Sequence, residues 1–375
     1  MWLIEALKRD CEITIITTGG WDLADLNAYY GTHISDDEVT VRIAPVPRLI
    51  RNRSAAAIRG ACFQRFAHQV AGEYDVRISS YNPTDWGLPA IHFIADFSWN
   101  AKIRERLHPQ SPGLIYKDTI LRRIYLDMAE MCARPSGRDV LHDGVLIANS
   151  GWTSKVIRES FNIDCAGVVY PPVWSVFPEV AWEQKEFAFV MIGRIAPEKK
   201  VEQSIAILNA VRSRGHAIKL RLCGRFGDDL YAKRIAQICE EHSQWIVLEG
   251  QVSGVRKAQI LSSCRFGIQA TSAESFGISI AEMVKAGAVV FAHDDGGQAE
   301  ILNHPSLLFK SEDDAVNKIC DVLSLEQKCT ALRANLANQA QLFSASAFIQ
   351  GARQCVASFL EVHQSESRAV ANPVS

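Results

Sequence analysis

Several patterns are missing from this sequence, and each absence disfavours a class of protein. The ten cysteines form no C-x-x-C pair, which favours reduced core cysteines over a disulfide framework or a zinc site. No apolar run approaches the roughly 20 residues that cross a bilayer, and residues 1–9 lack the layout of a signal peptide. Since neither G-x-G-x-x-G nor G-x-x-x-x-G-K occurs, a dehydrogenase and a P-loop kinase are disfavoured. We therefore expect a cytoplasmic protein of another class.

Positive and negative charges are almost balanced in this chain. The chain has 40 Lys and Arg against 42 Asp and Glu, so no global charge argues for a nucleic-acid partner. Hydrophobic residues make up 48% and charged residues 22%, as in ordinary globular proteins. A length of 375 residues suits about two domains.

Strand-like and helix-like segments alternate along the whole chain. In the first half we expect strands at 12–17, 39–43, 76–79, 91–95, 146–148 and 168–170, and helices at 1–9, 48–72, 114–132 and 154–160. In the second half we expect strands at 187–192, 218–223, 245–249, 266–268 and 288–292, and helices at 201–214, 230–241, 254–263, 281–286, 298–302 and 346–362. This alternation predicts an α/β fold with mostly parallel sheets.

Pro171 and Pro172 stop both strand and helix, so we place a domain boundary there. The prediction is two doubly wound, Rossmann-like domains that face each other across a cleft, at 1–170 and 171–345. The helix at 346–362 follows them, and a polar tail is expected at 363–375. Because ligands of such sheets bind at the carboxyl ends of the strands, the loops there are the candidate site.

Three loops of the second domain carry candidate chemistry. Gly193 allows close approach to the backbone, and Arg194 and Lys199 offer the two usual cations for phosphate, although a solvated basic loop is an alternative. Two glycines, Gly296 and Gly297, lead into a predicted helix, which alone fits a plain turn.

The third loop, Glu274-Ser275-Phe276-Gly277-Ile278, joins a buried strand to a helix. The free N–H groups of Phe276, Gly277 and Ile278 at a helix start favour an anion. Glu274 and Glu282 then suit hydroxyl groups of a sugar and a ribose; the alternative is a helix cap and an exposed glutamate. All three loops follow strands of one sheet, so one ligand could touch them all.

The order of G-R-x-x-x-E-K, E-S-F-G with a second Glu, and D-x-G-G-x-x-E resembles the retaining glycosyltransferases of family 4, which have the GT-B fold. The resemblance is strong over 187–302 and weaker over 139–173, and it is nearest to bacterial mannosyltransferase-like and hexosyltransferase-like members. It implies transfer of a hexose of mannose or glucose type from a GDP- or UDP-linked sugar to a glycan or lipid-linked acceptor.

The resemblance also implies residue roles. Arg194 and Lys199 neutralise the departing diphosphate, Glu274 holds the donor sugar near its anomeric carbon, Glu282 binds the ribose, and Val252 contacts the nucleobase. The helix at 346–362 is expected to cross back to the first domain. Fixed cations and aligned N–H groups stabilise charge on a leaving phosphate. No D-x-D occurs, so neither a metal bound through that motif nor a further cofactor is expected.

The first half departs from the resemblance. The family begins with a strand and a glycine-rich loop, whereas Met1 lies in the first predicted helix, so we expect the first domain to lack its first strand. Asp96, after the strand at 91–95, is a candidate for orienting the acceptor hydroxyl, with a structural carboxylate as the alternative. We interpret His92 as a satisfied core histidine.

Residues 42–65 carry six arginines and no acidic residue. One interpretation is a basic face that contacts anionic lipid, which would place the protein at the inner face of the membrane; a solvated helix face is the alternative.

Other functions remain open. A glycosidase needs no phosphate clamp beside its two carboxylates and is disfavoured. A nucleotide-sugar epimerase and a degenerate donor-binding module without turnover remain alternatives.

Overall fold

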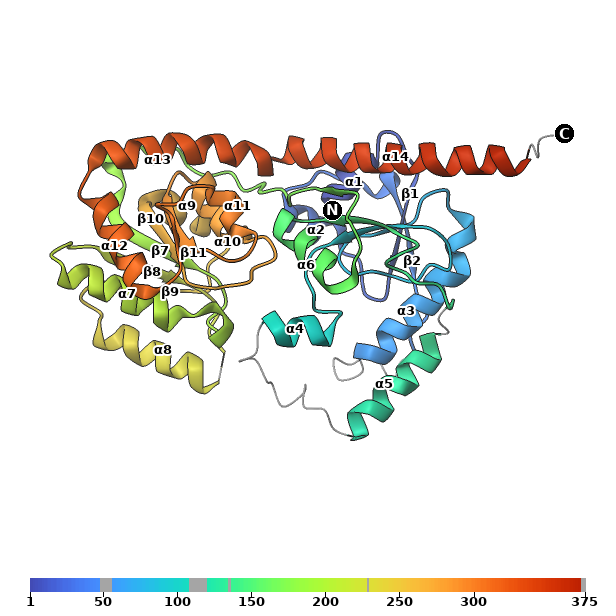
Figure 1. The fold of residues 1–375 in the computed structure, drawn as a ribbon, viewed down its shortest axis with the longest axis horizontal. Coiled ribbons are helices and arrows are strands. Elements are labelled where there is room, and N and C mark those ends of the chain that lie inside the picture. Colours follow the sequence, from blue (N-terminus) through green and yellow to red (C-terminus); the bar gives the residue numbers. More distant parts are fainter. Residues whose placement is uncertain (48–55, 108–119, 134–135, 228, 372–375) are drawn as a thin grey trace.

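The computed structural model describes residues 1–47, 56–107, 120–133, 136–227 and 229–371. Every strand pairing within them is parallel. Helices flank the sheets of two domains that lie side by side (Figure 1). The protein is therefore an α/β protein, as the alternation of segments predicts.

The second domain contains a six-stranded sheet in the order β12-β11-β10-β7-β8-β9. Its strands are β7 (Glu186–Ile192), β8 (Lys219–Cys223), β9 (Ile246–Gly250), β10 (Cys264–Gln269), β11 (Val289–His293) and β12 (Leu308–Phe309). The helices are α7 (Val201–Ser213), α8 (Leu230–Glu241), α9 (Gly254–Ser263), α10 (Ile278–Lys285), α11 (Gln298–Leu302), α12 (Glu312–Leu323) and α13 (Glu326–Gln339). The central strands are apolar on both faces, which is what a sheet covered by helices on both sides requires.

One continuous core holds this domain together. Phe189, Phe266 and Phe291 come from three neighbouring strands and are at most 1% exposed. The rings of Phe189 and Phe266 stack with centroids 5.1 Å apart. Burial of large side chains at about 25 cal/mol per Å² of apolar surface makes this cluster a main source of stability.

The first domain differs from the expected single sheet. Its strands form a pair, β1 (Ile13–Thr17) with β2 (Val39–Ile43), and a separate four-stranded sheet in the order β3-β4-β5-β6. That sheet contains β3 (Ile78–Ser79), β4 (Ile91–Ile94), β5 (Val145–Ala148) and β6 (Gly167–Val168). Within the described ranges no strand lies between β1 and β3 to pair with both, so the strands of this domain form two separate sheets.

The helices of the first domain are α1 (Trp2–Leu7), α2 (Leu23–Tyr30), α3 (Ala56–Val70), α4 (Ala101–Leu107), α5 (Ile120–Ala133) and α6 (Gly151–Phe161). The predicted helices at 48–72 and 114–132 correspond to α3 and α5, and their parts at 48–55 and 114–119 lie outside the described residues. The helices α2, α4, α12 and α13 were not predicted.

The last helix, α14 (Ala345–Ala371), packs on the first domain. Its residues Ala352 and Val356 share a buried cluster with Ala6 of α1, and the Arg353 side chain donates to the Ala6 carbonyl at 2.6 Å. Figure 1 shows α13 and α14 following each other along one side of both domains. The helix continues past residue 362, where the sequence suggested a polar tail, because residues 363–372 contain no glycine or proline that would end it.

Candidate functional site

The three loops singled out in the sequence follow three adjacent strands. Gly193–Lys199 follows β7, Glu274–Ile278 follows β10, and Gly296–Gly297 follows β11, and β10 lies between the other two strands in the sheet. Since the strands are parallel, all three loops lie at the same edge of the sheet. The fold therefore brings together residues that are about a hundred positions apart.

The loop after β7 holds the candidate cations. It is fixed at its start by the Gly193 N–H, which donates to the Cys223 carbonyl at 3.0 Å. The Lys199 ammonium contacts the Glu274 carboxylate across the two loops. Arg194 is 70% exposed at its side chain and pairs with Glu198 at 2.9 Å. Lys199 is thus built into the site, whereas Arg194 lies at its rim.

The turn after β10 combines a buried side chain with free backbone donors. Phe276 is 3% exposed and its ring packs against Tyr170 at 5.7 Å and Phe343 at 6.2 Å. Gly277 precedes α10 with φ at 102°, a left-handed conformation that glycine adopts without strain. Within the described residues, the N–H groups of Phe276, Gly277 and Ile278 donate to no acceptor. These groups at the start of α10 are available to an anion.

Glu282 lies one turn into α10 and has a partner that the sequence did not suggest. Its carboxylate pairs with the Lys257 ammonium of α9 at 2.6 Å, and the Glu282 side chain is 9% exposed. The pairing depends on how α9 packs beside α10, so no local motif could have revealed Lys257. A ligand hydroxyl that bound Glu282 would also lie near this ammonium.

The glycine pair after β11 packs closely against the backbone of the turn after β10. The Gly297 N–H donates to the Glu274 carbonyl at 2.7 Å. A Cβ atom on Gly296 would lie 2.7 Å from the Glu274 backbone, and one on Gly297 would lie 2.4 Å from the Ser275 carbonyl oxygen. Both positions require glycine because two backbones approach closely there. The observed contacts of Gly296 and Gly297 are therefore with the turn itself.

Val252 and Asp96 lie at other strand ends. Val252 follows β9 and is half-buried against the core of the second domain. Asp96 follows β4 of the first domain, where it accepts hydrogen bonds from the Tyr81 hydroxyl and from the Ser98 N–H at 2.8 Å. Burial, together with the Asp96 charge, raises the pKa of Tyr81 to about 12. Tyr81 therefore stays a neutral donor to Asp96, and that carboxylate has a fixed orientation.

Two further charged side chains line the candidate site. Glu198, next to Lys199, holds Arg194, and the Lys200 ammonium donates to the Ser272 hydroxyl at 2.9 Å. Glu198 belongs to the motif G-R-x-x-x-E-K, so its position could have been noticed. Lys200 follows directly after that motif, and its contact became visible only in the fold.

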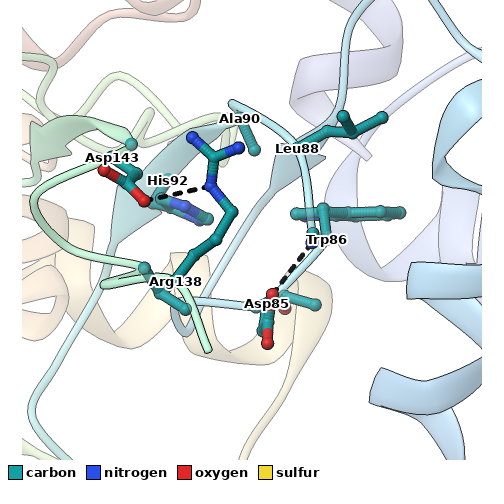
Figure 2. Close-up of a pocket in the computed structure, with 11 residues that line it drawn as sticks. Asp85, Trp86, Leu88, Ala90, His92, Arg138 and Asp143 are labelled. Atoms are coloured by element: carbon teal, nitrogen blue, oxygen red, sulfur yellow. Dashed lines mark hydrogen bonds and ion pairs between the residues drawn. The ribbon is translucent and has the colours of Figure 1, made fainter. Parts of the chain in front are cut away.

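A separate pocket lies at the amino ends of β4 and β5, whereas Asp96 lies at the carboxyl end of β4 (Figure 2). It is lined by residues ahead of β4 and β5, among them Asp85, Trp86 and Asp143, and by His92. His92 is 2% exposed, and its Nδ1 has no hydrogen-bond partner among the described residues. Its interpretation as a satisfied histidine is therefore wrong at this atom. Burial lowers the pKa of His92 to about 4.

The basic segment at 42–65 is described only in part, since 48–55 lies outside the described residues. Arg42 pairs with Glu73 at 2.5 Å and also donates to the Tyr74 hydroxyl at 2.8 Å, so this arginine is engaged within the fold. Arg65 is exposed on α3. Among the described residues, no helix has the length and apolar character needed to cross a bilayer.

The sequence is similar to known proteins over its second half. Residues 173–342 match the family described as "Glycosyl transferases group 1". The mouse GDP-Man:Man(3)GlcNAc(2)-PP-Dol alpha-1,2-mannosyltransferase is 25% identical over 203 residues, which are 48% of this chain and 41% of that protein. The corresponding protein of Xenopus laevis is 28% identical over 167 residues, 41% of this chain and 34% of the relative. The match thus spans less than half the length of these relatives.

Solved structures match over nearly the whole chain. Sucrose-phosphate synthase from Thermosynechococcus elongatus has a TM-score of 0.69 at 14% identity and covers 96% of this chain and 92% of its own. Anabaena HepE in complex with UDP and glucose has a TM-score of 0.64 at 16% identity and covers 95% of each chain. The chain thus has the GT-B fold with two Rossmann-like domains, which confirms the predicted fold class.

The match of 173–342 covers all three loops of the candidate site. That part of the chain is similar to the group 1 glycosyl transferases.

Proposed function

We propose that this protein transfers a hexosyl group of mannose or glucose type from a nucleotide diphosphate sugar to a glycan or lipid-linked acceptor. One observation carries the proposal. A loop with two cations, a loop with free N–H groups and a glycine loop meet at the ends of three adjacent strands. Lys199 of the first loop contacts Glu274 of the second. Such an arrangement suits a ligand that has both a diphosphate and sugar hydroxyls.

The diphosphate would bind between the loop after β7 and the start of α10. Lys199 and Arg194 supply positive charge, and Phe276, Gly277 and Ile278 supply N–H groups. As the bond to the sugar breaks, negative charge grows on the leaving phosphate, and fixed donors stabilise this charge most. The phosphate competes with Glu274 for Lys199, which releases the Glu274 carboxylate to accept from hydroxyls of the donor sugar.

The remaining assignments extend from this centre. Glu282 accepts from the ribose diol, Val252 contacts the base, and Gly193, Gly296 and Gly297 keep the backbone close to the donor. On the acceptor side, Asp96 orients the attacking hydroxyl. These roles are supported by the position of each residue at a strand's carboxyl end or in the first turns of a helix.

We also propose that the reaction retains anomeric configuration and needs no metal. Charge compensation is assigned to Arg194 and Lys199, so a bound cation is not required for it. With no carboxylate assigned as a nucleophile, the acceptor hydroxyl attacks from the face that the phosphate leaves. The departing phosphate takes the hydroxyl proton, so the sugar–phosphate bond breaks as the new glycosidic bond forms.

GDP-mannose is the first donor to examine, because the curated relatives are named as GDP-Man mannosyltransferases. We propose a GDP- or UDP-linked hexose and no further cofactor. A thermal-shift panel of GDP-, UDP- and ADP-sugars should show stabilisation by one base class over the others, with a dissociation constant in the micromolar range or lower.

Product identification then separates the possible activities. Transfer predicts release of the nucleoside diphosphate together with a glycosylated acceptor. Conversion of the donor to an epimer without an acceptor would point to an epimerase, and stabilisation without any turnover would leave a binding module. Either result would overturn the proposed transfer.

A further inference from the structure

The two domains meet directly behind the turn that would hold the donor. The Ser275 carbonyl oxygen accepts from the Ser150 hydroxyl at 2.5 Å and from the Thr153 hydroxyl at 3.1 Å. Ser150 and Thr153 belong to the start of α6 in the first domain and are fully buried. The backbone of the donor turn is therefore held by side chains from the other domain.

Glu300 of α11 holds the same end of α6. Its carboxylate accepts from the Gly151 N–H at 2.9 Å, from the Trp152 N–H at 2.6 Å and from the Tyr170 hydroxyl at 2.9 Å. The first N–H groups of a helix lack partners within the helix and attract negative charge. A carboxylate that accepts two such N–H groups makes charge-assisted bonds, which are about twice as strong as neutral ones.

Glu300 and the donor turn belong to one connected unit. Between them lies Gly297, whose N–H donates to the Glu274 carbonyl, and a Cβ atom on Gly297 would lie 3.0 Å from the Ser150 Cβ. A further bond joins the Trp152 indole N–H to the Asp295 carboxylate at 3.1 Å. The start of α6, the glycine loop and the turn are thus packed without room to shift independently.

The contacts of the Ser275 carbonyl also fix the direction of the Phe276 N–H. Ser275 C=O and Phe276 N–H belong to one planar peptide unit, and in a trans peptide they point in opposite directions. All peptide bonds described here are trans. Because the Ser275 carbonyl points to α6, the Phe276 N–H points away from α6.

We propose that Glu300 is a positioning residue that fixes the start of α6 behind the donor turn, so that the turn's N–H groups stay directed at the diphosphate and the two domains stay aligned. The proposal rests on the proposed function of the site. Glu300 does not touch the reacting atoms, and it acts through Ser150, Thr153 and Ser275.

The test compares Glu300→Ala and Glu300→Gln with Glu159→Gln, an exposed glutamate of α6 whose nearest ion-pair contact is a 3.9 Å approach to Lys155. Donor binding stoichiometry is measured by calorimetry, and transfer and donor hydrolysis are measured side by side. For Glu300→Ala we expect kcat to fall by at least about tenfold, with near-stoichiometric donor binding and a lower ratio of transfer to hydrolysis. The Gln variant, which keeps one acceptor oxygen, should be intermediate, and Glu159→Gln should match the wild type.

Hydrogen exchange gives a readout that does not depend on activity. In Glu300→Ala the peptide that contains Gly151 and Trp152 should exchange faster, while peptides of the second-domain core remain protected. If Glu300→Ala does not fold, Thr153→Val tests the next contact between α6 and the turn, since it removes the hydroxyl that donates to the Ser275 carbonyl and accepts from the Ser150 hydroxyl; its transfer-to-hydrolysis ratio should also fall.

Two results would overturn the positioning role alone. One is wild-type transfer and exchange in both Glu300 variants. The other is an equal loss of transfer and hydrolysis that follows the loss of donor-binding protein, because that is ordinary destabilisation. A wild-type chain that binds no nucleotide sugar would overturn the proposed function, and the positioning role with it.

Discussion

Opposite charges meet at the centre of the candidate site. Lys199 contacts Glu274, and Lys257 contacts Glu282 at 2.6 Å. Each pair joins a cation suited to phosphate with a carboxylate suited to hydroxyl groups, so a carboxylate that gives up its cation to a phosphate gains hydrogen bonds from sugar hydroxyls. This exchange matters because an uncompensated charge in a partly buried site is costly.

The Lys199→Ala substitution tests the central cation. We expect transfer to fall about a hundredfold or more, because a fixed positive charge on the leaving phosphate is lost, while the melting temperature changes little. Steady-state kinetics and thermal unfolding measure the two effects. Lys233→Ala, at an exposed position on α8, is the matched control and should keep wild-type rates. Full activity of Lys199→Ala would contradict the assignment.

His92 makes stability depend on pH. Its pKa is lowered from 6.5 to about 4 by burial, so between these values the unfolded chain binds a proton that the folded chain does not. Stability therefore falls as pH drops from 6.5 to 4, by up to about 3 kcal/mol, and this loss is absent above pH 6.5.

Urea unfolding at several pH values measures the effect of His92. A His92→Gln variant should lose less stability than the wild type between pH 6.5 and 4.5, whereas His142→Gln, at an exposed histidine, should follow the wild-type profile. Parallel profiles for His92→Gln and the wild type would refute the role of His92.

Much of the candidate site could be predicted because its residues have local requirements. Gly277 needs a left-handed conformation, and Phe276 to Ile278 start a helix directly after a buried strand. Lys257 could not be predicted, and Glu300 ends the motif D-x-G-G-x-x-E without revealing its partners, because these contacts depend on the packing of α9 beside α10 and of α11 against α6. The substrate roles of the site residues stay predictions.

Among the elements, the strands of the second domain were the most predictable. β7 and β11 are almost continuous apolar segments, and a buried parallel sheet requires that pattern. The helices α12 and α13 were missed, although α12 begins at a capping Ser311 that accepts from the Asp314 N–H. The divided sheet of the first domain depends on which strands pair, and periodicity carries no information about pairing.

The helix α14 is expected to stabilise the first domain rather than the donor site. Val356 is 5% exposed in a cluster that includes Phe348 and Ala6. The Val356→Ala substitution should lower the free energy of unfolding by about 2 kcal/mol. Val255→Ala, at a position that is 74% exposed on α9, should change it by less than about 0.5 kcal/mol.

Denaturant unfolding of the two valine variants, together with calorimetric donor binding, measures both effects. Donor affinity should stay at the wild-type value in each variant. A loss of donor affinity in Val356→Ala would show that α14 supports the donor site, and it would contradict the expectation that α14 stabilises only the first domain.

At the scale of the whole molecule, one surface suits a membrane. The helix α5 packs against the basic helix α3, and Ile124, Met128 and Met131 of α5 are more than 50% exposed. These three positions lie on one helix face. An apolar face beside exposed arginine is typical of helices that lie at an anionic membrane surface, and we propose peripheral contact there.

Co-sedimentation with vesicles tests the membrane contact. The protein should bind vesicles that contain anionic lipid, bind less at high salt, and lose binding in a Met128→Asp, Met131→Asp double variant. A matched double variant on the second domain, Val176→Asp with Leu230→Asp, should bind as the wild type does. Binding that is absent, or that is insensitive to salt, would contradict the proposal.

The central claim is hexosyl transfer with retention, and time-resolved NMR of the product tests it most directly. The purified chain is incubated with GDP-mannose, UDP-glucose or ADP-glucose and a panel of glycan and lipid-diphosphate acceptors. We predict release of nucleoside diphosphate with one donor and a product whose anomeric proton has the α configuration of that donor. A β product would contradict retention, and the absence of nucleoside diphosphate release across the panel would contradict transfer itself.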